Sequence, residues 1–505
     1  MITKEKHAKD IISLFSEECN ISIPQYEILN KGGEDYLSIY AGTKNKFFLS
    51  TLSEIKSELS EENIFKNSVF LSDFKKIDNW LLSHEIEYLQ TLLSESLTIG
   101  KNTLDSDFHK KFIPFVGDEE KRIESKTNNI IYGRRGAGKS SLILYGCNKI
   151  IKDKIPFAWI AMQQFQGRKD IQVIPQFLYE MVTECDKYLD NKITSRLKEI
   201  IFELEKIGSK LTFEEIKIKL PLFSRYFLPF VKANKFFYLF IDDLHLLREE
   251  IQPLLLSALY SIARGNNIYL KISAIESLTS LFNYELSEGM QPPGDIQIIR
   301  LDYNLVYPEK AHKHINDILG SYVEYSGIPS LNKICESKTR RRLTWTCAGV
   351  PRDALYIFNN SISKAINEKR KKIAITDINM SAADSMTEKE RFISDDVSDN
   401  QKTIRGLIEE IKDFCVDVAH SNAFLVHIDY RSDKYKLIKK LIDLRFLHIL
   451  HPGITPDRRN EKYEALLLDY AFYTGFRRTS TIQEFKEIPK SFTSKELRGL
   501  KKIKM

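Results

Sequence analysis

The residues best suited to chemistry form a glycine-rich run from Gly133 to Ser140, with the sequence Gly-Arg-Arg-Gly-Ala-Gly-Lys-Ser. A short apolar stretch, 130–132, precedes the run, and a helical pattern begins at Ser141. Glycines let successive backbone N–H groups turn toward a phosphate, and the start of a helix adds partial positive charge. A lysine and a serine at the end of such a run suit the β/γ-phosphates and magnesium. The run therefore predicts a site for ATP and Mg²⁺.

Within this run we assign Lys139 to the β- and γ-phosphate oxygens and Ser140 to magnesium. The predicted nucleotide-binding residues are Gly133, Gly136, Ala137, Gly138, Lys139, Ser140 and Ser141. The alternative, a glycine-rich turn without a ligand, does not explain why a strand and a helix flank the run.

A second candidate is the apolar run 236–241, which ends in Asp242 and Asp243. Adjacent carboxylates repel each other, and a cation between them removes that cost. We predict that Asp242 holds magnesium and that Asp243 polarises the attacking water. The alternative, a strand that simply ends in turn-forming aspartates, is weakened by the phosphate loop earlier in the chain. His245 is interpreted as a packed or hydrogen-bonded residue rather than a ligand.

Composition and length constrain the elements that position these residues. The chain has 505 residues, of which 43% are hydrophobic and 29% charged, so we expect three or four folded domains rather than a disordered chain. The six cysteines form no CxxC pair, which is typical of a reducing compartment. The polar start and the lack of a long apolar stretch predict a cytoplasmic protein without a membrane segment.

Short apolar runs alternate with helical patterns in the middle of the chain, which predicts an α/β P-loop NTPase core with a parallel sheet. The expected strands are 130–132, 157–161, 236–241, 268–274 and 296–301. The expected domains are an α+β N-terminal region of unknown role (1–110), the ATPase core (111–301), a helical lid (302–385), a C-terminal domain (401–475) and a basic tail (476–505). The acidic stretch from Asp384 to Asp399 is interpreted as a linker, and 191–234 as an insertion.

The loop, the Asp-Asp strand and the strand 269–274 together resemble the AAA+/STAND division of P-loop ATPases. Origin-recognition-type ATPases and their bacterial relatives are the most similar members, and the resemblance covers about 110–475. It implies that Ser273 is the polar tip of the sensor-1 strand and that Val116 lies near adenine. The run 347–355 is similar to the lid motif of the division, which implies Pro351 near adenine and Arg352 as the sensor-2 arginine on the γ-phosphate.

Two departures from this division bear on activity. Rings of this kind carry an arginine finger after the sensor-1 strand, but the interval from Glu276 to Gln297 contains no arginine. This absence favours a nucleotide-gated switch over a ring motor. Asp243, in place of the usual glutamate, predicts slow hydrolysis.

A helical pattern at 434–444, an apolar run at 446–450, a turn at Pro452-Gly453 and a returning strand at 463–470 predict a winged helix, as in the origin-recognition relatives. As a DNA-binding module it would use Lys436, Lys439 and Lys440 on the helix and Arg458 and Arg459 on the wing. As a protein-docking module, the same residues would form a solvated face.

Other basic clusters are Arg340-Arg341-Arg342, 369–372 and the tail after Arg477, and each is equally consistent with phosphate binding or with a solvated surface.

Three functions remain open at this stage. The first is an ATP-dependent regulatory switch that couples nucleotide state to double-stranded DNA or to an effector protein encoded nearby, in bacterial anti-phage defence. The second is a DNA-loading or remodelling ATPase that works as a ring or filament. The third is a nucleotide-binding scaffold that hydrolyses ATP slowly. By analogy with the division we also expect an oligomer.

Overall fold

The computed structural model of this chain forms two compact units, which we describe separately. The central unit contains Ile99–Asp302 and Asp443–Arg445, and the composite unit contains Met1–Thr98, Tyr303–Ile442 and Phe446–Met505. The structure describes residues 2–21, 23–31, 34–41, 45–72, 79–100, 103, 112–114, 119–168, 170–301, 305, 307–396, 400–429, 431–456, 461–473 and 492–504.

The central unit is built on a five-stranded sheet in the order β10-β4-β7-β6-β5, and every neighbouring pair of strands is parallel. The strands are β4 (Asn129–Tyr132), β5 (Phe157–Ala161), β6 (Phe237–Asp242), β7 (Ile268–Ala274) and β10 (Gln297–Arg300). All five predicted apolar runs are strands of this sheet. Because parallel strands end at the same edge, the segments that follow β4, β6 and β7 come together there.

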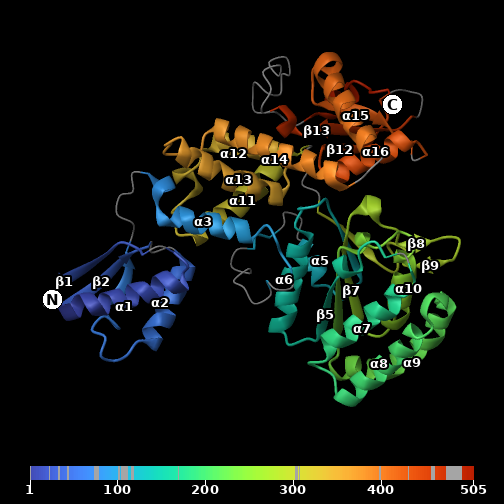
Figure 1. Cartoon of the computed structure of the whole chain (residues 1–505), viewed down its shortest axis with the longest axis horizontal. Coiled ribbons are helices and arrows are strands. Elements are labelled where there is room, and N and C mark those ends of the chain that lie inside the picture. Colours follow the sequence, from blue (N-terminus) through green and yellow to red (C-terminus); the bar gives the residue numbers. More distant parts are fainter. Residues whose placement is uncertain are drawn as a thin grey trace. The chain divides into compact units, whose positions relative to one another are not determined.

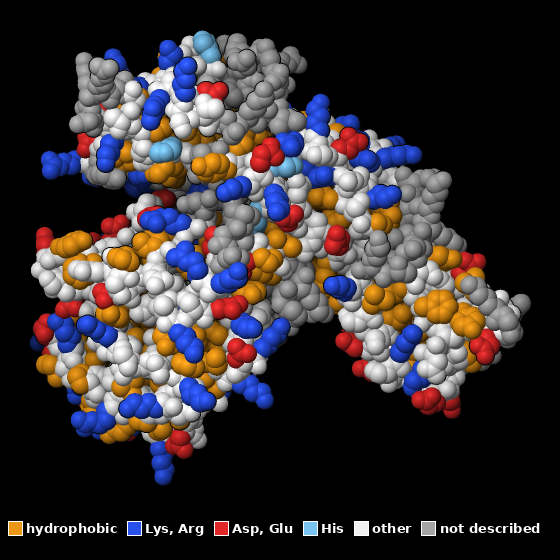
Figure 2. Space-filling model, turned by 180° about the vertical axis from the view of Figure 1, so that it is seen from behind, with side chains coloured by type: hydrophobic (Ala, Val, Ile, Leu, Met, Phe, Trp, Pro, Cys, Tyr) orange, Lys and Arg blue, Asp and Glu red, His pale blue; other side chains and the backbone are white. Residues whose placement is uncertain are grey.

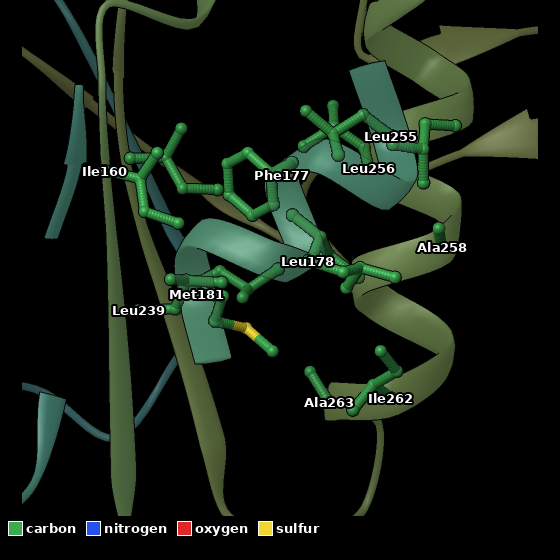
Figure 3. Close-up of a cluster of buried hydrophobic side chains, with 14 of the residues drawn as sticks. Ile160, Phe177, Leu178, Met181, Leu239, Leu255, Leu256, Ala258, Ile262 and Ala263 are labelled. Atoms are coloured by element: carbon green, nitrogen blue, oxygen red, sulfur yellow. The ribbon is translucent and has the colours of Figure 1, made fainter. Parts of the chain in front are cut away.

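Helices cover both faces of this sheet, as Figure 1 shows for α5 and α6 on one side and α7 and α10 on the other. These helices are α5 (Glu119–Ile123), α6 (Lys139–Lys152), α7 (Val173–Cys185) and α10 (Gln252–Ala263). Figure 3 shows side chains of α7 between the sheet and α10. Its labelled residues are Ile160 and Leu239 of the sheet, Phe177, Leu178 and Met181 of α7, and Leu255, Leu256, Ala258, Ile262 and Ala263 of α10. Each buried large apolar side chain stabilises such a core by about 1.5–3 kcal/mol.

The segment 191–234 forms a helical pair on the α7 side: α8 (Asn191–Glu205), η4 (Gly208–Lys210) and α9 (Phe213–Ala233). The start of α9 is fixed by a capping box, in which the Thr212 N–H donates to Glu215 Oε2 at 2.7 Å. Phe223 and Phe227 of α9 join the core that α7 and α10 form, so this segment enlarges that core. Shorter elements of the unit are η3 (Met162–Phe165), η5 (Leu244–Leu246), η6 (Glu276–Leu278), β8 (Phe282–Asn283) and β9 (Glu288–Gly289).

The composite unit begins with a small α/β part. Its elements are α1 (Ile2–Glu18), β1 (Tyr26–Lys31), β2 (Glu34–Tyr40), α2 (Lys46–Glu58), β3 (Val69–Ser72), η1 (Trp80–Leu82) and α3 (His84–Glu95). β2 pairs with β1 antiparallel and with β3 parallel. Gln90 of α3 donates to Ser363 Oγ at 2.9 Å, which joins this part to the helices that follow.

Those helices are α11 (Pro308–Tyr325), η7 (Leu331–Lys333), α12 (Ser337–Thr346), α13 (Pro351–Asn367) and α14 (Ile375–Asp396). The prediction of a linker at 384–399 is wrong as far as Asp396, because α14 includes that stretch. Ile378, Ala382 and Met386 recur at helical spacing and are buried, so one face of α14 packs, whereas Asp384 and Glu388 are exposed. Asp399 lies outside the described residues.

The C-terminal part consists of α15 (Asn400–Asp413), a π-helical turn η8 (Phe414–Ala419), β11 (Ala423–His427), α16 (Asp433–Asp443), β12 (Leu447–Ile454), β13 (Tyr463–Leu468), η9 (Tyr470–Tyr473) and α17 (Ser494–Arg498). Its sheet has the order β11-β13-β12 and is antiparallel. The turn predicted at Pro452-Gly453 is wrong, because β12 continues through it to Ile454 with shifts in register. The sequence analysis did not predict β11, which also pairs with Lys502.

This architecture confirms the predicted fold class: a P-loop NTPase core with a parallel sheet and flanking helices, followed by a helical region and a C-terminal helix–sheet part, with an α/β N-terminal part. All six cysteines are buried and none forms a disulfide. Within the described residues, no helix is both long and apolar enough to cross a membrane.

Candidate nucleotide-binding site

The glycine-rich run connects the end of β4 to the first turn of α6. Gly136 and Gly138 have φ of 81° and 95°, in the left-handed region that glycine adopts without strain. A Cβ at Gly133 would lie 3.3 Å from Leu301 Cβ and 3.2 Å from Ala137 Cβ, so the backbone passes close to its neighbours there. The run therefore has a backbone conformation that favours glycine at Gly136 and Gly138, and a tight approach at Gly133.

Lys139, the first residue of α6, turns back over this loop. Its ammonium donates to the backbone oxygens of Gly133 at 3.2 Å and Arg134 at 3.4 Å. The side chain is buried, and its Nζ lies 3.9 Å from Asp243 Oδ1. A buried ammonium at the start of a helix, beside a glycine-rich loop, is a strong potential donor to an anion.

Asp242 ends β6 and is buried at the same edge of the sheet. Its Oδ1 accepts from Ser140 Oγ of α6 at 3.3 Å and from Ser273 Oγ of β7 at 2.5 Å. Burial first, and the neighbouring Asp243 second, raise the pKa of Asp242 from 3.8 to about 6. Among the described residues these two hydroxyls are the hydrogen-bond donors to the carboxylate, and neither carries a charge that would balance it.

These oxygens fit a magnesium ion. Mg²⁺ takes oxygen ligands at 2.0–2.1 Å in octahedral geometry, so two adjacent ligands lie about 3 Å apart. Ser140 Oγ and Asp242 Oδ1 are separated by 3.3 Å. A divalent cation there would also stabilise the ionised form of Asp242, which burial disfavours.

Asp243 has a left-handed backbone, with φ 58° and ψ 51°, a conformation that is uncommon for any residue other than glycine. Its backbone N–H donates to Ser273 Oγ at 2.8 Å. Ser273 thus contacts both carboxylate residues, donating to one and accepting from the other. The Asp243 side chain is 40% exposed, so it faces solvent at the edge where the loop lies.

Lys271 of β7 is a buried residue that the sequence analysis did not single out. Its ammonium donates to Ser125 O at 2.6 Å, Thr127 O at 2.9 Å and Asn129 Oδ1 at 2.5 Å, at the end of the sheet opposite the loop. Burial lowers the pKa of Lys271 to about 7, while the three oxygens stabilise its charged form. A lysine within an apolar strand was the signal available in the sequence, and its role is structural.

Pro351 and Arg352 form the first turn of α13 in the composite unit. Arg352 is exposed, whereas its neighbour Asp353 is buried and pairs with Lys389 of α14 at 3.1 Å. Lys389 lies 3.9 Å from Asp469 Oδ2, which in turn contacts His448 Nε2 at 3.0 Å. A network of four ionisable side chains, of which Lys389 is partly exposed and the other three are buried, therefore fixes the helix start that carries Arg352.

The predicted nucleic-acid residues on α16 have different environments. Lys436 and Lys440 are exposed, and Lys436 pairs with Asp433 at 2.9 Å. Lys439 donates to both oxygens of the buried Glu464, at 2.9 and 3.0 Å, and so attaches α16 to β13. Val116, Arg458 and Arg459 lie outside the described residues.

The Arg340-Arg341-Arg342 cluster contacts the composite unit itself. Arg340 donates to Asn332 and to Cys335 O, Arg341 pairs with Glu309 at 2.7 Å, and Arg342 donates to Tyr470 OH at 3.2 Å. These contacts favour a structural interpretation of the cluster. Figure 2 likewise shows lysine and arginine side chains interspersed with acidic and apolar ones on the face it presents.

No family model matches the sequence, and no curated protein shows significant similarity to it. Among solved structures, a chain of Drosophila ORC bound to DNA is similar over 84% of this chain and 99% of its own, with 12% identity and a TM-score of 0.38. The Aeropyrum pernix ORC1 protein in complex with DNA is similar over 73% and 92%, with 11% identity and a TM-score of 0.40. The Walker-type ATPase of Pyrococcus abyssi is similar over 74% and 99%, with 10% identity and a TM-score of 0.42. At such values the likeness assigns neither an activity nor a partner to this chain.

Proposed function

We propose that this protein is a regulatory ATPase: it binds ATP with magnesium at 133–140, hydrolyses it slowly, and uses the nucleotide state to control binding to DNA or to a partner protein. The observation that carries the proposal is the meeting of Ser140, Asp242 and Ser273 through one carboxylate oxygen, next to the lysine of the loop. No packing requirement explains a buried carboxylate held by two neutral hydroxyls.

Each residue then has a distinct role. The backbone N–H groups of the loop and the start of α6 bind the phosphates, and the Lys139 ammonium exchanges its two carbonyl acceptors for β- and γ-phosphate oxygens. Ser140 and Asp242 would hold magnesium, which when bound supplies positive charge against the transferred phosphoryl group. Asp243 orients and polarises the attacking water, and Ser273 holds the backbone of Asp243 at the end of the sheet.

The test is isothermal titration of the whole chain with ATP and magnesium. Lys139→Ala should abolish binding, whereas Lys149→Ala, an exposed lysine on the same helix, should leave it unchanged. Asp243→Asn should bind ATP like the wild type and lose turnover, because it removes only the charge on the water-polarising group. Unchanged ATP affinity in the Lys139 variant would overturn the site assignment.

Regulation through the lid is part of this proposal. Arg352 would contact the γ-phosphate, and the Asp353–Lys389–Asp469 contacts would transmit the position of α13 to the C-terminal sheet. What supports this step is the resemblance at 347–355 and the exposed arginine next to a fixed aspartate.

The proposed partner is either duplex DNA or another protein. Duplex DNA is favoured by the exposed Lys434, Lys436 and Lys440 on α16, which would contact phosphates. An effector protein encoded nearby, in anti-phage defence, rests on the resemblance alone, and so does assembly into an oligomer. An adjacent effector gene would support the switch, whereas an adjacent replication gene would support the alternative of a DNA-loading ATPase.

A further inference from the structure

His245 is a buried residue in the immediate surroundings of the proposed water-polarising carboxylate. It lies in η5, directly after β6, and its side chain is only 4% exposed. The position of η5 is fixed, because Leu246 O accepts from Gly167 N at 3.2 Å and Leu246 N donates to Asp243 O at 3.0 Å. The imidazole is therefore held at a defined place beside Asp243.

The Nδ1 atom of His245 is buried and has no hydrogen-bond partner among the described residues. It lies 3.8 Å from Asp243 Oδ1, which is too long for a hydrogen bond. A buried polar atom without a partner costs free energy, so a native structure that retains one calls for an explanation.

The same carboxylate oxygen lies between two nitrogen atoms. Lys139 Nζ is 3.9 Å from Asp243 Oδ1 and His245 Nδ1 is 3.8 Å from it, so neither forms a hydrogen bond. The backbone of Asp243, in contrast, is fixed on both sides by Ser273 Oγ and by Leu246 N. Only the side-chain torsions of Asp243 are left to determine where its second oxygen points.

The imidazole is suited to donate rather than to carry charge. Burial lowers the pKa of His245 to about 4, with Lys139 and Arg135 acting in the same direction and Asp243 opposing them. A neutral imidazole has one N–H, and the carboxylate facing Nδ1 favours the tautomer that places the proton there.

We infer that His245 is a positioning residue for ATP hydrolysis: its Nδ1–H closes onto Asp243 Oδ1 when Lys139 engages the phosphates, and this contact directs the other oxygen of Asp243 to the attacking water. The inference rests on the proposed ATPase function and adds a residue to it. A rotation of the Asp243 side chain that shortens the distance by less than 1 Å gives hydrogen-bond geometry.

Three variants of His245 distinguish a positioning role from a role in packing alone. His245→Phe keeps the ring volume without a donor, His245→Gln places an amide near the Nε2 position, and His245→Asn places its amide N–H near the Nδ1 position. We expect His245→Phe and His245→Gln to lower kcat about 10- to 100-fold, because a misdirected catalytic group costs rate rather than binding. His245→Asn should retain most of the wild-type kcat.

The experiment measures ATP affinity by isothermal titration and single-turnover hydrolysis for the wild type, the three variants and each variant combined with Asp243→Asn. ATP affinity should stay within about twofold throughout, and no His245 substitution should lower the rate further once Asp243 is changed. Equal losses in His245→Asn and His245→Phe, or losses that add to that of Asp243→Asn, would overturn the inference and leave the ATPase intact. A wild-type chain that neither binds nor hydrolyses ATP would instead overturn the proposed function, and this inference with it.

Discussion

Two pairs of acidic residues, each with at least one buried member, have different surroundings in this molecule. Asp353 and Asp469 in the composite unit share Lys389, and His448 contacts Asp469 as well. Asp242 and Asp243 in the central unit have two serine hydroxyls and a lysine 3.9 Å away. Lys389 lies 3.1 Å from Asp353 and 3.9 Å from Asp469, and we call these two aspartates the neutralised pair. In the second pair the buried Asp242 accepts from two neutral hydroxyls, and the lysine lies beside Asp243 instead. A buried negative charge that the protein leaves unbalanced indicates a place for a cation from outside.

The largest expected effect comes from breaking the neutralised pair. Lys389→Met leaves Asp353 and Asp469 buried without their shared cation, and should lower the free energy of unfolding by about 3–5 kcal/mol. Thermal or urea unfolding measures this loss. The matched control is Lys364→Met, whose partner Asp384 is 62% exposed, and which should cost less than about 1 kcal/mol. Equal effects of the two substitutions would remove the distinction between the two carboxylate sites.

Without magnesium, Asp242→Asn should raise the free energy of unfolding, whereas Lys389→Met lowers it. The pKa of Asp242 is raised from 3.8 to about 6 in the folded state, so folding binds a proton between these values and stability falls as pH rises through that window. At pH 7.5 the substitution should therefore stabilise the magnesium-free protein by up to about 3 kcal/mol, an advantage that disappears near pH 4. Added magnesium and ATP should stabilise the wild type and not the variant.

Unfolding curves at several pH values measure this effect. Asp170→Asn is the control, because the Arg168 guanidinium lowers the pKa of Asp170 and its removal should not stabilise the fold. If Asp242→Asn lowers the free energy of unfolding at pH 7.5 without magnesium, the carboxylate has an internal partner and the comparison fails.

A smaller effect is expected at Arg352, which follows the start of a helix fixed by the neutralised pair. Arg352→Ala should weaken ATP binding about tenfold and leave ADP binding within about twofold, because only ATP carries the γ-phosphate. Titration with both nucleotides measures the ratio, and Arg341→Ala is the control, since Arg341 pairs with Glu309. Equal losses for ATP and ADP would make Arg352 a surface charge of the lid.

The smallest effect concerns DNA. If α16 contacts duplex phosphates, changing Lys436 and Lys440 to Ala should reduce the slope of log affinity against log salt by about 1.8. Fluorescence anisotropy at several salt concentrations, with and without ATP, measures it. Lys439→Ala should leave the slope unchanged, because that lysine is bound to Glu464. No binding at low salt in either nucleotide state would favour the protein-docking alternative.

The central unit was predictable because its signals are local. Each strand of its sheet is a short apolar run between helical patterns, and the loop and Asp242-Asp243 follow strands directly. The serine contacts to Asp242 follow from the strand order, since β7 lies between β4 and β6 and places Ser273 beside both. The position of His245 near Asp243, in contrast, depends on the 3₁₀ turn η5, which the sequence pattern did not predict.

The composite unit was harder to predict because its contacts join distant residues. Acidic residues at 384–396 suggested a linker, although the apolar residues of α14 keep a helical spacing. Arg342 donates to Tyr470 OH, 128 residues away in the sequence, so its structural role could not be predicted from local patterns. β11 is a five-residue strand whose partner, β13, begins at Tyr463, after an intervening helix and strand.

The sharing of Lys389 between α13 and the segment after β13 has a consequence for how this protein can be divided or recombined. A fragment beginning at Asn400 would retain Asp469 and His448 without the lysine, and would uncover Tyr470, whose ring packs near Trp345 of α12. Exchange of the C-terminal part between relatives would succeed only if the recipient offered a lysine and an aromatic surface at matching places. The helices from Pro308 onward and the C-terminal sheet should therefore be kept together in any truncated or recombined protein.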